Sequence, residues 1–171
     1  FFDVAIGNIP FGQFKVSDKR YDKLNFNIHD YFFAKTLDKV RPGGIIAFVT
    51  SRYTMDKQNG KVREYINERA ELLGAIRLPN TAFKDSANTK AVSDILFLQK
   101  RDAPIVKQSE WTYTSKDEHG YVMNNYFIEH PEMVLGHVEM TKAMYGREDL
   151  TVVPFENIPL QESLQKAISH I

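Results

Sequence analysis

Short apolar runs separated by segments of helical periodicity are the feature that most constrains the fold of this chain. The four runs are Val4–Gly7, Ile45–Val49, Gly74–Leu78 and Asp94–Gln99. Runs of this length and apolar content are typical of strands that are covered on both faces of a sheet. Helical segments between the first three runs favour right-handed crossovers, so these strands are expected to be parallel. No helical pattern precedes the last run, and we expect that strand to be antiparallel.

Two helices are predicted between the parallel strands. Asn25 is placed to cap a helix that runs through His29–Val40 and ends at Pro42-Gly43-Gly44. A second helical stripe is formed by Val62, Tyr65, Ile66 and Leu73. The pattern therefore predicts an α/β fold with helices on both faces of the sheet.

Composition excludes several classes of protein. The 171 residues contain no cysteine, so disulfides and thiolate metal sites are ruled out, and five scattered histidines show no ligand spacing. We therefore expect no metal site. Neither a membrane-spanning apolar stretch nor a signal sequence is found, and we expect a cytoplasmic protein without membrane contact. A formal net charge of zero argues against strong nonspecific affinity for DNA.

The first apolar run ends in Asn8-Ile9-Pro10-Phe11, which places an amide, a carbonyl and an aromatic ring at one strand tip. The side-chain oxygen of Asn8 and the carbonyl of Ile9 can each accept a hydrogen bond from a planar amino group. Both N–H bonds would then be held, and the nitrogen lone pair would face an electrophile. Pro10 restricts the backbone around that carbonyl. Phe11 offers a face on which an extruded base can stack.

This tetrapeptide resembles motif IV, (Asn/Asp/Ser)-Pro-Pro-(Tyr/Phe), of the amino-group methyltransferases that use S-adenosylmethionine. The Asn form is typical of adenine-N6 enzymes, and Ile9 departs from the usual first proline. That position contributes a carbonyl in the family, so Ile9 can still supply it with less rigidity. The resemblance implies that Asn8, Ile9, Pro10 and Phe11 are catalytic and that Asn8 and Pro10 contact the cofactor.

Later segments extend the resemblance to type I modification subunits and to the methylase segment of very large proteins of conjugative elements and phages. The segments are Arg41–Val49, Leu73–Pro79, Phe83, Asp94–Leu98 and Tyr126–Gly136. The resemblance implies strands four to seven of a Rossmann-like methyltransferase sheet, with the last strand antiparallel. It also implies a restriction-modification context, with DNA as the partner.

Substrate contacts are expected at the carboxyl ends of the parallel strands, where open α/β sheets bind their ligands. Basic residues interleaved with aromatics follow the motif, a pattern that fits contact with a nucleic-acid backbone. The loop Pro79–Ser93 is long and lies at the same edge. The predicted substrate-binding residues are Phe14, Lys15, Lys19, Arg20, Lys23, Arg52, Phe83 and Lys84. Asn88 and Lys90, which lie in the loop Pro79–Ser93 with the last two, could join them. Two alternatives to these substrate contacts remain open. The basic segment after the motif could be a solvated loop, and Phe83 could fill the end of the core.

The cofactor half of a methyltransferase sheet has a glycine-rich turn after its first strand, and this chain has no such turn. It begins at Phe1 without an initiator methionine, so we expect a segment of a longer protein whose main S-adenosylmethionine pocket and N-terminal half lie elsewhere. We therefore expect the isolated chain to be inactive or nearly so. A helicase-like segment is a further expected partner.

Residues 1–103 are expected to form the catalytic half, and residues 104–171 a small C-terminal extension. In the extension, Trp111–Thr114 could be a short strand, Asn124–Phe127 a turn, and Pro131–Tyr145 shows patchy helical periodicity. Leu160–Ile171 is predicted to be an amphipathic helix, so the extension could serve as an arm.

Three functions remain open at this point. The first is a fragment of a DNA adenine-N6 methyltransferase. The second is a methylase of RNA or of protein glutamine, since those enzymes share the motif. The third is a degenerate methylase fold that acts as a scaffold or DNA-binding module.

Overall fold

A mixed four-stranded sheet forms the centre of the protein. The computed structural model describes residues 1–83, 91–142 and 146–171. The strands are β1 (Phe2–Asn8), β2 (Val40–Ser51), β3 (Ala70–Arg77) and β4 (Ser93–Lys100), in the order β1-β2-β4-β3. β1 and β2 are parallel, whereas β4 runs antiparallel to both β2 and β3. The α/β class and the antiparallel last strand, both predicted from the sequence, are confirmed.

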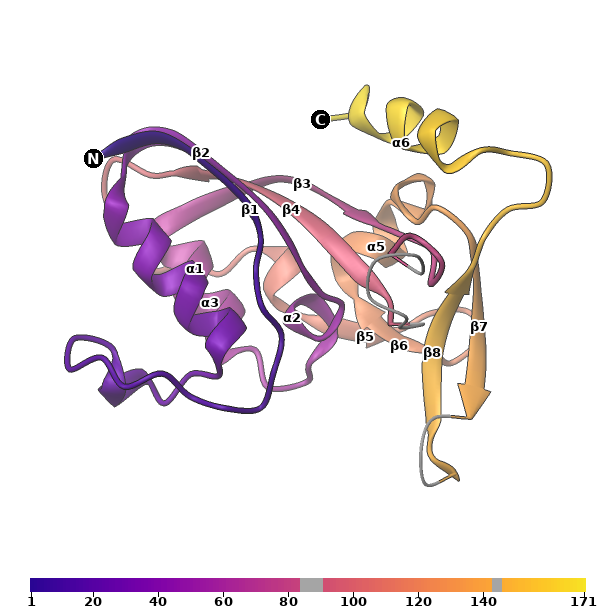
Figure 1. The fold of residues 1–171 in the computed structure, drawn as a ribbon, viewed down its shortest axis with the longest axis horizontal. Coiled ribbons are helices and arrows are strands. Elements are labelled where there is room, and N and C mark those ends of the chain that lie inside the picture. The colour runs from indigo at the N-terminus through magenta and orange to yellow at the C-terminus, as the bar shows by residue number, and fades with distance from the viewer. Residues whose placement is uncertain (84–90, 143–145) are drawn as a thin grey trace.

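Helices lie on both sides of this sheet (Figure 1). α1 (Ile28–Lys39) and α3 (Lys61–Arg69) contact each other on one side. There the ring of Phe33 packs edge-on against Phe48 of β2, with 5.4 Å between ring centroids. α6 (Leu160–Ile168) lies on the other side.

The boundaries of three elements differ from those predicted. Asn25 does not cap α1: it ends the short 3-10 helix η1 (Asp22–Leu24) with a left-handed backbone, φ 57°, and α1 starts after Asn27. Pro42-Gly43-Gly44 lies inside β2, which begins directly after α1, and Gly43 takes a φ of 79° next to a register shift between β1 and β2. Leu73 belongs to β3, so the second helix is shorter than its apolar stripe suggested.

Residues after 103 contain short elements that the sequence analysis largely missed. They are η2 (Glu110–Thr112), β5 (Thr114–Lys116), β6 (Val122–Asn124), α5 (Asn125–Glu129), η3 (Pro131–Met133), β7 (His137–Lys142) and β8 (Glu148–Val153). The patchy helical periodicity of Pro131–Tyr145 corresponds to no α-helix in the described part of that range, where η3 is followed by β7, which pairs antiparallel with β8. The strand expected at Trp111–Thr114 is mostly the turn of η2. The terminal helix is confirmed as α6.

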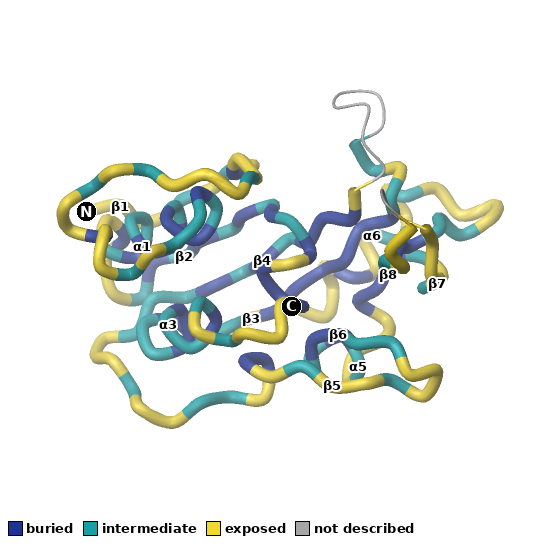
Figure 2. The backbone as a smooth tube through the Cα atoms, turned by 90° about the horizontal axis from the view of Figure 1, so that it is seen from below, coloured by how far each residue is buried: buried dark blue, intermediate teal, exposed yellow. Residues whose placement is uncertain are grey.

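This C-terminal part packs directly onto the outer edge of the sheet. Leu135 N–H donates to the carbonyl of Arg77 at 2.9 Å, and Asn80 N–H donates to the carbonyl of Val152 at 2.8 Å. Apolar side chains of the C-terminal part belong to the same core cluster as those of the sheet, among them Trp111, Phe127 and Val152. The buried backbone therefore continues from β3 and β4 into this region (Figure 2).

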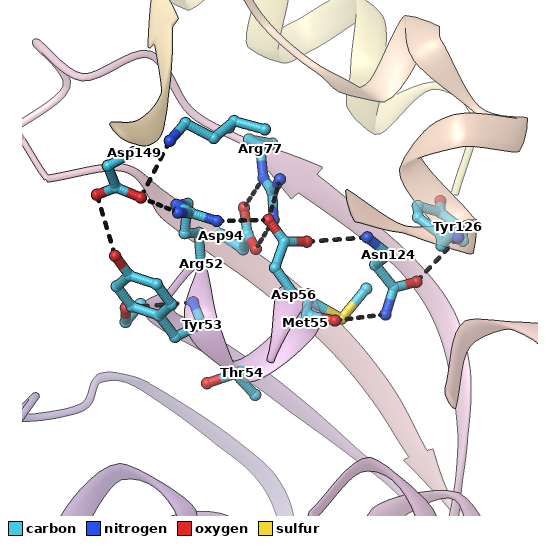
Figure 3. A network of polar contacts seen from close by, with 12 residues as sticks. Arg52, Tyr53, Thr54, Met55, Asp56, Arg77, Asp94, Asn124, Tyr126 and Asp149 are labelled. Atoms are coloured by element: carbon cyan, nitrogen blue, oxygen red, sulfur yellow. Dashed lines mark hydrogen bonds and ion pairs between the residues drawn. The ribbon is translucent and has the colours of Figure 1, made fainter. Parts of the chain in front are cut away.

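A buried ion-pair network joins the two parts (Figure 3). Arg77 on β3 is fully buried and binds both carboxylate oxygens of Asp94 on β4, at 2.8 and 2.9 Å. It also binds Asp56 at 2.7 Å. Asp56 ends the short helix α2 (Tyr53–Asp56), and its other oxygen accepts the backbone N–H of Asn124 on β6.

Asp56 is held ionised by its partners. Burial by itself would raise the pKa of this carboxyl, but Arg77, Arg52 and the Asn124 N–H together lower it below its ordinary value. A carboxyl with a depressed folded pKa contributes stability above its unfolded pKa of about 3.9. That contribution is lost as the pH falls through the folded value.

We expect Asp56→Asn to reduce the free energy of unfolding by about 3 kcal/mol at pH 7, because it leaves buried guanidinium charge with fewer counterions. The difference from the unsubstituted protein should begin to shrink below about pH 4, where the Asp56 carboxyl of the unfolded chain takes up a proton, and should keep shrinking down to the lower folded pKa. Urea unfolding at pH 7 and pH 3 measures both values. Asp102→Asn, at an exposed site, is the control and should change little. Equal stability of Asp56→Asn and the unsubstituted protein at pH 7 would contradict the role given to the network.

Candidate functional site

The tetrapeptide Asn8-Ile9-Pro10-Phe11 lies where β1 ends, at the carboxyl edge of the two parallel strands. Asn8 is the last residue of β1 and pairs with Val49 of β2. The chain then leaves the sheet as a loop that leads to η1 and α1. Such a position beyond the ends of parallel strands is where open α/β sheets bind ligands.

Ile9 anchors this strand tip. Its side chain is 5% exposed and belongs to the main core cluster, while its neighbours Asn8 and Pro10 are exposed. Its backbone N–H donates to the carbonyl of Val49 at 3.1 Å. A proline in this position has no N–H and could not make that bond. Ile9 therefore replaces the rigidity of a proline ring with a hydrogen bond and a buried side chain.

The groups expected to hold an amine are left without a hydrogen-bond partner in the described parts of the chain, and Asn8 is exposed. No hydrogen bond joins the Asn8 side chain or the Ile9 carbonyl to any residue in the described parts of the chain. Phe11 is 41% exposed beside them. Two oxygen acceptors and one aromatic face thus share the strand tip, an arrangement that can bind a planar donor group.

The basic loop after the motif is only partly neutralised. Arg20 forms an ion pair with Asp38 at 3.3 Å, and Lys15 hydrogen-bonds the side chain of Asn25. Lys19 and Lys23 are exposed, and Phe14 is 57% exposed. Their role in substrate binding stays a prediction.

The remaining predicted substrate contacts differ in their settings. Arg52 is buried and binds Asp56 at 2.9 Å and also Asp149 of β8, which places it in the ion-pair network. Phe83 is half-buried and packs against the core. Lys84, Asn88 and Lys90 lie outside the described residues. The substrate-binding roles of Arg52 and Phe83 stay predictions.

One exposed aromatic at the same edge was not assigned a role from the sequence. Tyr53 is 50% exposed at the start of α2, directly after β2. The guanidinium carbon of Arg52 lies 4.4 Å from its ring centroid, and its hydroxyl donates to Asp149 at 3.0 Å. The partner that orients Tyr53 lies 96 residues away in the chain, so local sequence gives no sign of it.

A buried carboxyl also lies at the start of α1, near the motif loop. Asp30 is 5% exposed and approaches Nε2 of His29 at 3.4 Å. Burial raises the pKa of the Asp30 carboxyl, and His29, Lys57 and Arg63 oppose that shift. Nδ1 of His29 is buried without a hydrogen-bond partner in the described region. The sequence analysis did not assign a role to this pair.

The described residues form neither a metal-binding cluster nor a membrane-spanning helix. Across residues 1–83, 91–142 and 146–171, no cluster of three or more His, Asp or Glu side chains could hold a metal ion. No helix within those ranges is long and apolar enough to span a bilayer.

Comparison with known families assigns the first half of the chain. Residues 1–83, which contain the strand tip, match the family model described as Eco57I restriction-modification methylase. The match supports a relation of this segment to the S-adenosylmethionine-dependent DNA methyltransferase-like family. The match confirms the resemblance expected from the sequence.

One curated relative is the Defense against restriction protein B of Escherichia phage P1. It is 31% identical over 131 residues, which cover 74% of this chain but only 6% of that protein. The chain thus spans a small part of the length of this relative.

Solved structures with a similar fold have low sequence identity. A Listeria monocytogenes protein assigned to the class I S-adenosylmethionine-dependent methyltransferases aligns with a TM-score of 0.47 and 24% identity, over 63% of this chain and 34% of that one. The M protein of the type I restriction enzyme EcoKI aligns with a TM-score of 0.46 and 12% identity, over 98% of this chain and 47% of that one.

Replacing Ile9 tests how the strand tip is held. We expect Ile9→Ala to lower the free energy of unfolding by about 2–4 kcal/mol, because it removes a buried side chain and leaves a cavity. Ile6→Ala, on β1 three residues before Ile9, is the matched control. Because Ile6 is 79% exposed, this substitution should change the free energy of unfolding little. Urea unfolding followed by circular dichroism measures both. Similar losses for the two variants would show that Ile9 is no special anchor.

Proposed function

We propose that this chain is the substrate side of a DNA adenine-N6 methyltransferase of the restriction-modification type. One observation carries the proposal: a parallel strand ends in an accessible Asn8 amide, an unoccupied Ile9 carbonyl and the exposed ring of Phe11. The family match over the same residues supports it.

The strand tip acts by positioning the substrate nitrogen. In the proposed complex the adenine N6 donates one N–H to the side-chain oxygen of Asn8 and the other to the carbonyl of Ile9. The base stacks on Phe11 after it leaves the helix. Both N–H bonds are then engaged, so the nitrogen lone pair points away from the two oxygens toward the methyl donor. No covalent enzyme intermediate is required, and the proton lost from nitrogen passes to solvent.

S-adenosylmethionine, when bound, supplies the electrophilic methyl group on its sulfonium sulfur. The residues described here fit a supporting role toward this cofactor, since Asn8 and Pro10 are exposed at the carboxyl edge of the sheet. We propose that most of the cofactor pocket lies in another segment of the full-length protein. The 171-residue chain alone is accordingly expected to transfer methyl groups poorly.

We propose DNA as the partner of the basic loop. Lys15, Lys19, Arg20 and Lys23 lie on the segment that follows the motif, and phosphate contacts by such residues position a duplex without reading its sequence. Further proposals are a catalytic half at residues 1–103, an extension at residues 104–171 and a cytoplasmic location. A mobile-element parent with a helicase-like segment is proposed as well, and the phage relative supports that context.

Asn8→Ala in the full-length protein tests the proposal. We expect kcat for methyl transfer to adenine in DNA to fall at least 100-fold, because the nitrogen is no longer held within about 1 Å of its reactive position. Mass spectrometry of N6-methyladenine in digested DNA measures the product.

The control is Asn59→Ala, at an exposed asparagine on the loop that follows α2. It should retain full activity. Unchanged transfer by Asn8→Ala would overturn the role of Asn8. Methylation of RNA or of protein glutamine in place of DNA by the unsubstituted protein would show that the acceptor is different. Failure to methylate any of the three acceptors would favour a scaffold.

A further inference from the structure

A cavity lies at the same edge of the sheet and takes no part in the reaction proposed above. Its volume is about 590 Å³, within the range typical of small-molecule sites. One wall comes from α2 and the residues after it, and the facing wall from the turn between β5 and β6 and from the β7–β8 hairpin. Its lining includes Tyr53, Lys57, Gln58, Tyr121, Met140 and Glu148.

Tyr53 is held in a fixed orientation in this wall. The Arg52 guanidinium lies 4.4 Å from its ring centroid, and Asp149 accepts a hydrogen bond from its hydroxyl at 3.0 Å. Asp149 in turn binds Arg52, which is anchored by Asp56 (Figure 3). Half of the Tyr53 surface is nevertheless exposed. The ring is thus covered on one face by a guanidinium and held at its hydroxyl, and an aromatic that is oriented in this way and still half exposed is suited to stack with a flat ligand.

The position of the cavity relates it to the strand tip. Asn8 pairs with Val49, and neighbouring strands are about 5 Å apart. Tyr53 is four positions after Val49 in the chain, a path of at most about 14 Å. The Cα atoms of Asn8 and Tyr53 are therefore within about 19 Å of each other. Stacked bases of one strand are spaced by about 3.4 Å, so the distance corresponds to a few nucleotides.

The lining favours a nucleobase over a phosphate group. Tyr53, Tyr121 and Met140 supply aromatic and thioether surface, whereas Gln58 and His119 can hydrogen-bond a base edge. Lys57 and Glu148 are both exposed in the lining and carry opposite charges, and Arg52 is paired with two carboxylates, so the lining has no excess positive charge for a phosphate. The Glu148 carboxylate could accept a hydrogen bond from an exocyclic amine. Sequence-tolerant binding of unpaired bases commonly combines such aromatic stacking with a guanidinium contact.

We propose that this cavity binds a nucleobase of the DNA strand that carries the target adenine, a few nucleotides from that adenine, by stacking on Tyr53. The inference rests on the proposed function, because it assumes that the substrate bound at the tip of β1 is DNA. Tyr53 is a binding residue here, and Arg52 and Asp149 position it.

The test uses the 171-residue chain and single-stranded oligodeoxynucleotides at low ionic strength. A series of oligonucleotides is used, each with a single adenine and a single fluorescent base, 2-aminopurine. The 2-aminopurine is placed at a different position before or after the adenine in each member of the series. Stacking on an aromatic ring quenches 2-aminopurine. We expect quenching at one flanking position, loss of that quenching in Tyr53→Leu, and about tenfold weaker binding by this variant in fluorescence anisotropy.

Tyr53→Phe is the matched control, because it keeps the ring and removes only the hydroxyl that donates to Asp149. It should retain most of the quenching. If Tyr53→Leu is less stable by thermal melting, Met140→Glu tests the opposite wall, since Met140 is 39% exposed and a charge there blocks the cavity without touching α2. That variant should also lose the quenching.

The outcomes separate this inference from the proposed function. The nucleobase site would be overturned if Tyr53→Leu or Met140→Glu bound the oligonucleotide with the same quenching as the unsubstituted chain. That result would leave the role of Asn8 intact. Absence of any oligonucleotide binding would contradict both the site and the DNA partner. Quenching at a flanking position that persists in Asn8→Ala but disappears in Tyr53→Leu would establish a second subsite.

Discussion

The structure depends most on the buried guanidinium of Arg77. A charge in the interior is costly unless it is paired, and here Asp94 and Asp56 together saturate it. Because these partners come from β4 and α2, the pairs fix the carboxyl end of β3, the amino end of β4 and the segment after β2 relative to one another. Phe127 of α5 lies on the same guanidinium, with its ring centroid 4.3 Å from the Arg77 guanidinium carbon, so the C-terminal part is held to the same point.

Two features of the carboxyl edge follow from this rigid base. At one end of the edge, Ile9 ties the strand tip to the core and leaves Asn8 and Phe11 exposed. At the other, Asp56 orients Arg52, and Arg52 shares Asp149 with Tyr53. The exposed groups that we propose to contact a ligand are thus supported by buried ones, an arrangement that lets a site bind without first reorganising its own side chains.

Much of the sheet could be predicted because its signals are local. Each strand of the sheet contains a run of apolar residues, and the helical segments between the first three runs leave few possible topologies. The errors in this region concern boundaries. Leu73 fits a helical stripe but lies in β3, and Asn25 has the chemistry of an N-cap but adopts the left-handed conformation at the end of η1. In both cases packing or a turn overrode a local preference.

The C-terminal part was predicted poorly because its elements are short and stabilised by distant partners. β5 and β6 have three residues each, too few for a periodic pattern, and β7 is mostly exposed. Its position depends on contacts such as Asn80 with Val152, which join residues far apart in the chain. Only α6, an amphipathic helix behind Pro159, carried a sufficient local signal.

The amino-acid sequence by itself determined the class of fold and the tetrapeptide at the end of β1, because hydrophobic periodicity and the chemistry of asparagine, proline and phenylalanine act over a few residues. Only the tertiary structure decided that Ile9 is an anchor, that Arg52 is saturated by carboxylates and that Tyr53 faces a cavity. The physical reason is that burial and ion pairing depend on which distant segments meet, and no short stretch of the chain specifies that.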